Sequence, residues 1–261
     1  MTDRSPIHRR RFVAGALGGT GALLLGGCDR LSQSDWARNL LGSAEGLTRW
    51  AQRLVSPRQV LAREYTEADL SPVFKANGTA DPDDDDYQAL AANQFADWRL
   101  VVDGLVQRPA RLSLADIRAL PSRTQITRHD CVEGWSCIGK WKGALLSTVL
   151  QQVGLQPNAR YLVFHCADPM EEGGDLSDAK YYESIGLGDA VHPQTILAYE
   201  MNGQTLPVAH GAPIRLRVER QLGYKMAKYV MRIEAVESYA RIGGGKGGYW
   251  EDRGYAWYAG I

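Results

Sequence analysis

The chain of 261 residues carries 30 Lys plus Arg and 30 Asp plus Glu, so its formal net charge is zero. A neutral balance provides no steering toward nucleic acid or an acidic membrane surface, and we expect no nucleic-acid partner. Hydrophobic residues make up 44% and charged residues 23% of the chain, which is the composition of a folded globular protein and excludes a disordered or polytopic membrane protein.

Residues 1–28 are predicted to be an export signal. Arg9-Arg10-Arg11 stands before Phe12 and an apolar, glycine-rich run too short for a membrane span, and it resembles a twin-arginine signal. Leu25-Gly26-Gly27-Cys28 resembles the lipobox of bacterial lipoproteins, and the following Asp29 is typical of those that stay at the inner membrane. We therefore expect a periplasmic protein with a lipid anchor at Cys28, and an ordinary cleaved signal is the alternative.

Two segments precede the main domain or open it. Residues 29–60 are predicted to form a helical tether or linker, because apolar residues recur near helical spacing and Pro57 stops the pattern. The acidic run Asp81–Asp86 lacks the glycine and the closing glutamate of a calcium loop, so we expect a solvated loop there.

Beyond Trp98 the pattern changes to strands. Runs of β-branched and aromatic residues bounded by turn residues predict strands at Arg99–Val106, Tyr161–Cys166, Ile196–Tyr199, Ile214–Val218 and Tyr229–Val236. Ser113 is expected to cap a short helix from Leu114 to Leu120, and Trp141–Val153 is expected to pass from a strand into a helix. This mixed order predicts an α+β fold with mixed or antiparallel sheets.

Cys131 is the most informative residue, because it lies among polar and charged neighbours in the segment Thr127–Ser136. Without Cys28, the remaining cysteines are Cys131, Cys137 and Cys166, an odd number that leaves at least one thiol unpaired in an oxidising compartment. One alternative is a Cys131–Cys137 disulfide. Another is a zinc site formed by the three cysteines and His165, although this spacing does not match structural zinc patterns.

Several blocks downstream match a known family in order and spacing. Tyr181-Tyr182-Glu183-Ser184-Ile185 is followed by Leu197–Gln204 and then by His210-Gly211-Ala212-Pro213-Ile214-Arg215. With Cys131, these blocks resemble the sulfite oxidase family, and the resemblance covers residues 61–261. It implies a sulfite oxidase-type molybdopterin-binding domain with mixed β-sheets and flanking helices. In that family one cysteine thiolate, here Cys131, ligates molybdenum held by molybdopterin, and a soft thiolate suits a metal already bound by sulfur.

The resemblance also implies contacts to the cofactor. His210 and Arg215 match residues that contact the pterin and its phosphate, to which arginine offers a bidentate fork. Met226-Ala227-Lys228 matches a turn that binds the same anion through backbone N–H groups and one ammonium. We therefore expect these five residues to bind the cofactor.

Upstream, Phe74, Lys75 and Asn77 fall where the family places a pterin-contacting segment. Ala76 departs from the animal and plant relatives, which carry an arginine near the metal, and this departure puts a sulfite-binding pocket in doubt. Cys166 occupies the strand-end position of another cofactor contact, where relatives carry Asp or Thr. These positions are also expected to face the cofactor.

Other residues receive roles by analogy or by proximity. Tyr181 aligns with the active-site tyrosine of sulfite oxidases, which could orient the substrate or move a proton. Arg128 and His129 precede Cys131 and are candidates to lower the pKa of its thiol or to attract an oxyanion, or else to be structural partners of nearby acids. Trp250 and Tyr255 resemble a closing segment, in which we expect packing.

The resemblance implies an exported molybdenum-cofactor oxidoreductase that transfers oxygen to or from a small sulfur-type or oxyanion substrate. The form Cys-Val-Glu-Gly-Trp-Ser at Cys131–Ser136 is similar to the bacterial periplasmic branch that includes a methionine sulfoxide reductase catalytic subunit, so the reaction direction stays open. No Cys-x-x-Cys-His haem motif occurs, so we expect electrons to pass through a separate cytochrome b or c. A monomer is expected because the family's dimerisation domain is missing. The alternative is a periplasmic accessory, electron-transfer or binding protein without turnover.

Overall fold

The computed structural model describes residues 60–170 and 180–261, and these residues form two β-sheets joined by short helices. The predicted signal at residues 1–28 and all but the last residue of the predicted tether at residues 29–60 lie outside the described residues. Within the described residues, no helix combines the length and the apolar character that a bilayer crossing requires.

The first sheet is mixed. Its strand order is β2-β1-β10-β5-β6, with β1 and β10 parallel and the other neighbours antiparallel. The bounds are β1 (Arg99–Gly104), β2 (Ala110–Ser113), β5 (Tyr161–Pro169), β6 (Lys180–Gly186) and β10 (Val230–Val236). The predicted strands at 99–106, 161–166 and 229–236 therefore belong to one sheet.

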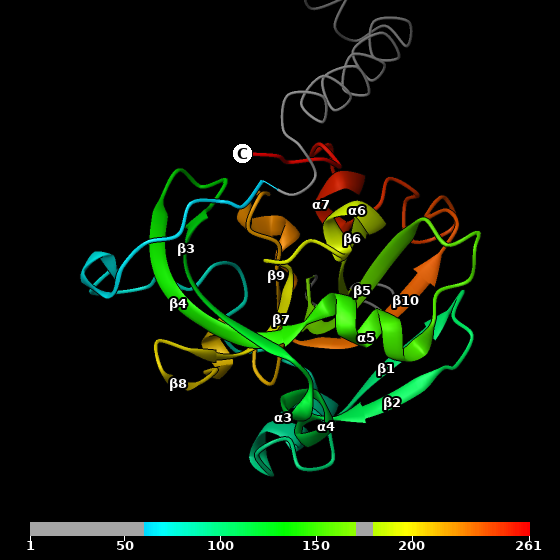
Figure 1. Cartoon of the computed structure of the whole chain (residues 1–261), viewed down its shortest axis with the longest axis horizontal. Helices are drawn as coiled ribbons and strands as arrows, with labels where there is room; N and C mark the ends of the chain where they lie inside the picture. Colours follow the sequence, from blue (N-terminus) through cyan, green and yellow to red (C-terminus); the bar gives the residue numbers. More distant parts are fainter. Residues whose placement is uncertain (1–59, 171–179) are drawn as a thin grey trace, which may run out of the picture. The chain divides into compact units, whose positions relative to one another are not determined.

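The second sheet is antiparallel, with the order β3-β4-β7-β8 and with β9 paired to β7. Its strands are β3 (Ser122–Asp130), β4 (Ser136–Leu145), β7 (Ile196–Met201), β8 (Gln204–Thr205) and β9 (Arg215–Arg217). Figure 1 shows β3 and β4 as a long curved pair, with β1, β2, β5 and β10 toward the opposite side of this part of the chain. The α+β prediction is confirmed.

Short helices connect the strands. They are η1 (Glu67–Asp69), α3 (Asp85–Ala92), α4 (Leu114–Ala119), α5 (Leu146–Val153), α6 (Leu187–Ala190), η2 (Val208–His210), η3 (Gly223–Lys225) and α7 (Tyr249–Asp252). Ser113 caps α4 as predicted, because its Oγ accepts a hydrogen bond from the Asp116 N–H at 3.1 Å. The loop predicted at 81–86 is wrong at its last two residues, Asp85 and Asp86, which belong to α3. Asp84 accepts from the Tyr87 N–H at 2.9 Å and starts α3.

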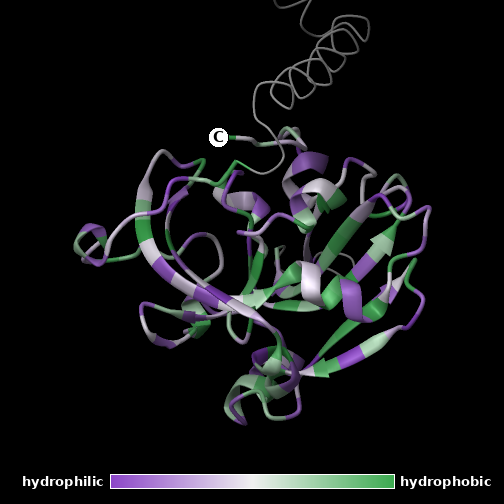
Figure 2. Cartoon of the chain, viewed as in Figure 1, coloured by the Kyte–Doolittle hydropathy of each residue, from purple (hydrophilic) through white to green (hydrophobic). Residues whose placement is uncertain are grey.

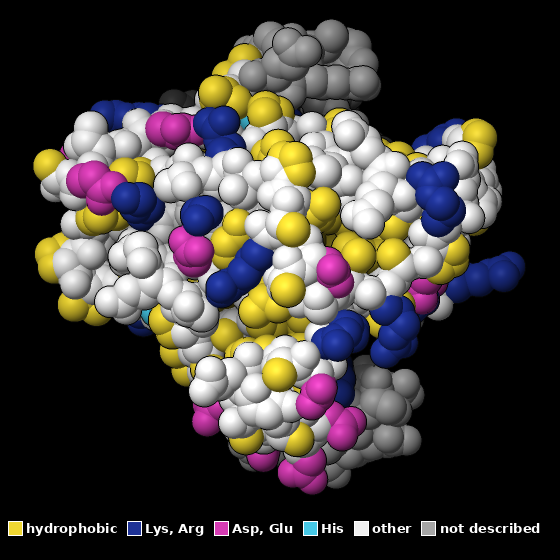
Figure 3. Space-filling model, turned by 60° about the horizontal axis from the view of Figure 1, so that its bottom comes forward, with side chains coloured by type: hydrophobic (Ala, Val, Ile, Leu, Met, Phe, Trp, Pro, Cys, Tyr) yellow, Lys and Arg dark blue, Asp and Glu magenta, His cyan; other side chains and the backbone are white. Residues whose placement is uncertain are grey.

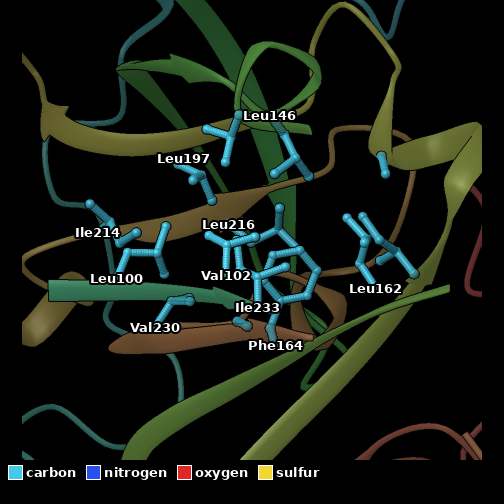
Figure 4. Close-up of a cluster of buried hydrophobic side chains, with 14 of the residues drawn as sticks. Leu100, Val102, Leu146, Leu162, Phe164, Leu197, Ile214, Leu216, Val230 and Ile233 are labelled. Atoms are coloured by element: carbon cyan, nitrogen blue, oxygen red, sulfur yellow. The ribbon is translucent and has the colours of Figure 1, made fainter. Parts of the chain in front are cut away.

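The main core lies between the two sheets. In Figure 4, apolar side chains of β1, β5 and β10 point toward side chains of β7 and β9, with Leu146 of α5 beside them. Leu100, Ile233, Leu197 and Leu216 are fully buried, and burying one such side chain stabilises the fold by about 1.5–3 kcal/mol. This packing fixes the strand ends from which the functional loops project.

Hydropathy differs between the sheets. Figure 2 shows mostly hydrophobic colour on β5 and β10, whereas β3 and β4 alternate between hydrophilic and hydrophobic stretches. On β3 the fully buried positions are polar, namely Gln125, Thr127 and His129. On the molecular face drawn in Figure 3, Lys and Arg side chains lie among Asp and Glu side chains, in keeping with the zero net charge.

Candidate active site

Cys131 lies in the turn between β3 and β4. The turn is closed by two backbone hydrogen bonds, from the Cys131 N–H to the Trp135 carbonyl at 2.9 Å and from the Gly134 N–H to the Cys131 carbonyl at 3.1 Å. Gly134 has a φ of +84°, which favours glycine because a side chain would strain this backbone. The turn therefore holds the thiol at a fixed place at the end of a long strand pair.

The disulfide and zinc alternatives for the cysteines are wrong. Cys131, Cys137 and Cys166 all carry free thiols, and the Cys137 thiol is buried against the Val73 carbonyl at 3.7 Å. Over residues 60–170 and 180–261, no group of three or more His, Cys, Asp or Glu side chains could hold a metal ion. Cys131 is thus a single soft donor.

A pocket beside Cys131 gathers residues from segments far apart in the sequence. Its lining includes five residues predicted as site residues, namely Asn77, Cys131, Tyr181, Met226 and Lys228. Its lining also includes Glu133, Asp168, Trp250 and Tyr255, which were not predicted to be there. Trp250 and Tyr255 were expected only to pack. They do stack on each other, with ring centroids 5.4 Å apart, but they also form part of the wall.

A cluster of basic groups lies close to this pocket. Arg215 is fully buried, and its guanidinium donates to the His210 carbonyl at 3.0 Å and to the Met226 carbonyl at 3.3 Å. Burial and the neighbouring Arg217 lower the pKa of Arg215 to about 9. Lys228 Nζ donates to the Thr79 and Ala209 carbonyls. Burial, then Arg215, lowers the pKa of Lys228 to about 7. The chain thus concentrates positive charge where solvent does not stabilise it.

Trp141 lies against both Arg215 and the neighbouring Arg217. The guanidinium carbon of Arg215 lies 5.1 Å from the ring centroid and that of Arg217 lies 4.4 Å from it. Arg217 forms a buried ion pair with Glu219 at 2.6 Å, whereas within the described residues Arg215 has no carboxylate partner. Cation–π contact stabilises Arg215 without neutralising it. Its charge remains available for an anion.

His210 completes the cluster. Its Nδ1 is buried and has no hydrogen-bond partner within the described residues. Burial lowers the pKa of His210 to about 4, and the charges of Arg215 and Lys228 add to this effect. The ring is therefore neutral at neutral pH and can offer one N–H donor.

The environment of Cys131 keeps its thiol protonated when no metal is bound. Burial raises the pKa of Cys131, and the Glu133 carboxylate adds to this effect, while the backbone of residue 133 and Lys75 oppose it. Ligation by a metal would have to deprotonate the thiol, as metals generally do.

Of the alternatives for Arg128 and His129, lowering of this pKa is wrong, whereas structural pairing of Arg128 with the nearby acid Asp130 is confirmed. Arg128 points away, since its Nε donates to Asp130 at 3.0 Å and its side chain is half exposed. His129 is fully buried, and Arg217 donates to its Nδ1 at 3.1 Å. Burial and Arg217 hold the pKa of His129 well below its usual value, so its ring carries no charge at neutral pH.

Phe74 and Lys75 contact different residues around the site. The Phe74 ring is buried against His129, Trp141 and His210, with centroids 5.8, 5.4 and 5.6 Å away. Lys75 is exposed and forms an ion pair with Glu133 at 3.5 Å. Neither lines the pocket beside Cys131, and their contact with a cofactor stays a prediction.

Cys166 and Ala227 lie behind the pocket wall. Cys166 is only 4% exposed and lines a neighbouring hollow together with Tyr181. Burial raises the pKa of its thiol well above the usual value. The Ala227 carbonyl accepts from the Leu216 N–H at 2.8 Å, which ties the Met226–Lys228 turn to β9. The structure brings the turn, but not the Cys166 thiol, to the pocket that Cys131 lines.

Tyr181 connects the pocket with the interior. Its hydroxyl donates to the Tyr224 carbonyl and lies 3.5 Å from the Glu183 carboxyl. Burial raises the pKa of Tyr181 well above its usual value, with Glu183 contributing, so the side chain remains a phenol. Asp168 shares the pocket, and burial raises its pKa to about 7 against the opposing charge of Lys228.

Residues 87–241 match the family described as oxidoreductase molybdopterin binding domain. The chain belongs to this family: it is a molybdopterin-dependent oxidoreductase with the α+β fold of the sulfite oxidase type, and its cofactor is molybdenum-molybdopterin. The predicted enzyme class, fold and cofactor are confirmed.

Two named relatives are similar over most of the chain. One is the putative protein-methionine-sulfoxide reductase subunit YedZ1 of Azospira oryzae, 38% identical over 97% of this chain and 87% of the relative. The other is the protein-methionine-sulfoxide reductase catalytic subunit MsrP of Ralstonia nicotianae, 32% identical over 88% of this chain and 69% of the relative.

Among solved structures, the sulfane dehydrogenase SoxCD of Paracoccus pantotrophus matches 55% of this chain with 23% identity and a TM-score of 0.49. This chain covers 39% of that one.

The described residues fit such a cofactor. Several buried polar atoms have no hydrogen-bond partner within the described part of the chain, among them Asn77 Oδ1, His210 Nδ1 and Arg215 Nε. Buried polar groups are normally satisfied, so these atoms indicate a polar ligand. A free thiol beside a buried cationic cluster suits a metal carried by an anionic, phosphate-bearing group.

Proposed function

We propose that this chain reduces sulfoxide groups to sulfides at a molybdenum held by Cys131. In this proposal His210, Arg215 and Lys228 bind the anionic part of the pterin, together with Asn77 and the backbone of Met226 and Ala227. Phe74, Lys75 and Cys166 form the surrounding shell. The observation that carries the proposal is the pocket. Cys131 and Tyr181 both line it, and the basic side chains of Lys228 and Arg215 lie beside them.

The bound cofactor supplies two-electron, oxygen-atom chemistry that protein side chains lack. Tyr181 provides a neutral O–H donor that can orient the substrate oxygen and deliver a proton. Trp250, Tyr255 and Met170 give the pocket apolar walls suited to the carbon substituents of a sulfoxide.

Charge near the thiol favours a neutral substrate over sulfite. Trp135 Nε1 donates to the Glu133 carboxylate at 2.8 Å, and this bond lowers the pKa of Glu133, with Lys75 also contributing. Glu133 is therefore a carboxylate on the pocket lining, and its ion pair with Lys75 offsets the charge of the cation nearest the thiol turn, which disfavours an anionic substrate there. Ala76 stands where sulfite oxidases carry a cationic arginine. The names of the two relatives, both protein-methionine-sulfoxide reductase subunits, support the same substrate class.

The electron donor is proposed to be a separate cytochrome b or c, and the location is proposed to be the periplasm, with a monomer attached to the inner membrane through Cys28. Changing Arg9 and Arg10 to Lys should block export of the loaded enzyme if the twin-arginine interpretation is right. Cell fractionation with an activity stain measures this. Normal periplasmic activity of the variant would contradict it.

The test of function begins with metal analysis of enzyme from a molybdenum-replete host, in which about one molybdenum per chain is expected from one thiolate ligand. The loaded enzyme should then oxidise reduced benzyl viologen when a methyl sulfoxide is added. It should oxidise sulfite slowly or not at all with ferricyanide as acceptor. Rapid sulfite oxidation without sulfoxide reduction would refute the proposed direction.

A further inference from the structure

Behind Tyr181 lie three charged side chains that are shut off from solvent. The side chains of Lys225 and Glu183 are 0% exposed, and that of Glu251 is 1% exposed. Lys225 Nζ lies 2.5 Å from Glu183 Oε1 and 2.5 Å from Glu251 Oε1. One ammonium therefore holds two carboxyl groups from different elements, β6 and α7.

The charges of this triad do not balance if every group ionises. Two carboxylates and one ammonium leave a net negative charge in a buried site, which is costly unless one carboxyl keeps its proton. Both carboxyls bind the same ammonium, which brings two acids into one buried site, and Glu251 Oε2 has no hydrogen-bond partner within the described residues. Burial raises the pKa of Glu183 well above its usual value, Lys225 opposes this, and Glu251 adds to it.

The titratable groups around Glu183 come from four elements. Tyr181 lies on its own strand, Lys225 on η3, Glu251 on α7 and Cys166 on the neighbouring strand β5. Of these, only Lys225 is cationic, and it is already shared by both carboxyls. The surroundings therefore favour a retained proton.

The geometry of β6 brings the Glu183 carboxyl close to the Tyr181 hydroxyl, which lines the pocket. Tyr181 and Glu183 are two residues apart on β6, so their side chains lie on the same face of the sheet. The Tyr181 hydroxyl lies 3.5 Å from Glu183 Oε2, the carboxyl oxygen that Lys225 does not bind. This distance is the outer limit of a hydrogen bond, and a small side-chain rotation would shorten it. The backbone of Gly248 seals the opposite side, since a Cβ there would lie 2.8 Å from Glu183 Oε1.

We propose that Glu183, held with Glu251 on Lys225, is a proton-relay residue that resupplies Tyr181 during turnover. This inference rests on the proposed sulfoxide reduction. In that reaction the sulfur–oxygen bond breaks, sulfur gains two electrons that come from the cytochrome donor, and the oxygen leaves as water after taking up two protons. Tyr181 supplies one of these protons and solvent in the pocket supplies the other. Glu183 then passes its proton to the Tyr181 phenolate. Because the triad is shut off from solvent, Glu183 regains a proton back through the Tyr181 hydroxyl, which lines the solvent-filled pocket.

The first test is infrared spectroscopy of the purified holoenzyme at neutral pH. The measurement is made in an Asp168→Asn background, because buried Asp168 has a pKa of about 7 and would add its own carboxyl band. This background should show the carbonyl stretch of a buried, protonated carboxyl group, and adding Glu183→Gln should remove the band. Asp189→Asn is the matched control, because it removes another buried carboxylate, one that pairs with Arg220 at 2.9 Å and lies on α6. That variant should keep the band. A band that persists in Glu183→Gln would overturn the proposal.

The second test is kinetic, with reduced viologen as the electron source and a methyl sulfoxide as substrate. Glu183→Gln should lower kcat by about 10-fold or more with little change in KM, since a positioned proton donor contributes roughly 10²–10⁴-fold. The kcat of Glu183→Gln should also vary less with pH than the kcat of the wild type, because glutamine cannot bind or release this proton. In a Tyr181→Phe background the Glu183 change should add less than about two-fold, because groups in one relay are not additive.

The outcomes separate the relay from the function. An active wild type with an equally active Glu183→Gln variant, or with effects of the Tyr181 and Glu183 changes that multiply, would overturn the relay alone. A molybdenum-loaded wild type without sulfoxide reduction would overturn the proposed function and the relay with it. Thermal unfolding of each variant identifies any loss of rate that comes from unfolding.

Discussion

Replacing Lys225 with Met should destabilise the fold strongly, because it leaves Glu183 and Glu251 buried against each other without their cation. Removing one partner of a buried ion pair costs about 3–5 kcal/mol. For a domain of this size each kcal/mol lowers Tm by roughly 2–4 °C, so the expected loss is about 6–20 °C. Lys142→Met is the control. It removes an ion pair to Glu200 whose side chains are 41% and 27% exposed, and such a pair contributes about 0–1 kcal/mol.

The effect of Lys225→Met should depend on pH. Burial raises the folded-state pKa of Glu183 above its unfolded value, and removing the opposing ammonium raises it further, so the folded state binds more protons and loses stability as pH rises. The difference from wild type should therefore be largest at neutral pH and should narrow as pH falls toward 4.5, the ordinary pKa of glutamate. Adding Glu183→Gln should restore part of the stability. Calorimetry at several pH values measures the stability of each variant. A loss of stability in Lys225→Met that is no larger than the loss in Lys142→Met would refute the reasoning.

Three further predictions concern the cofactor. Cys131→Ala should abolish turnover while circular dichroism stays unchanged, because backbone bonds close its turn; full activity would reject Cys131 as the ligand. Arg215→Ala should reduce molybdenum per chain, whereas Arg123→Ala, which breaks a partly exposed ion pair with Glu64, should not; equal metal content would count against the anion-binding role of Arg215. Uptake of cofactor by the cofactor-free chain should weaken as pH rises through about 7, where Lys228 loses its charge, and Lys228→Met should flatten this profile; a flat wild-type profile would contradict it.

The strands that sequence reasoning found and missed differ in what they bury. β5, β7 and β10 bury Leu, Val, Ile and Phe, so their hydropathy reveals them. β3 also alternates between buried and exposed residues, but its buried side is formed by Gln125, Thr127 and His129. Gln125 is satisfied there by Glu219 at 2.8 Å. A strand that buries hydrogen-bonded polar groups has no apolar period, so the pattern could not predict it.

Sequence motifs identified those pocket-lining residues that belong to the family's blocks. They could not identify residues that only the tertiary structure brings to the pocket. Cys131, Asn77, Tyr181 and Lys228 come to one pocket, as the resemblance implied. The burial of Glu183 was missed, although its place two residues after Tyr181 on a strand was a signal that both share one face. Asp168 and Trp250 carry no local signal, since only the packing of distant segments brings them to the pocket.

The wall of the pocket also has a consequence for biosynthesis. It runs in sequence from Asn77 to Tyr255, so the stacked pair of Trp250 and Tyr255 is the last part of this wall to be synthesised. A nascent chain that still lacks these residues has an open, incomplete pocket and cannot enclose a ligand. Enclosure of the cofactor must therefore follow synthesis of the chain through Tyr255.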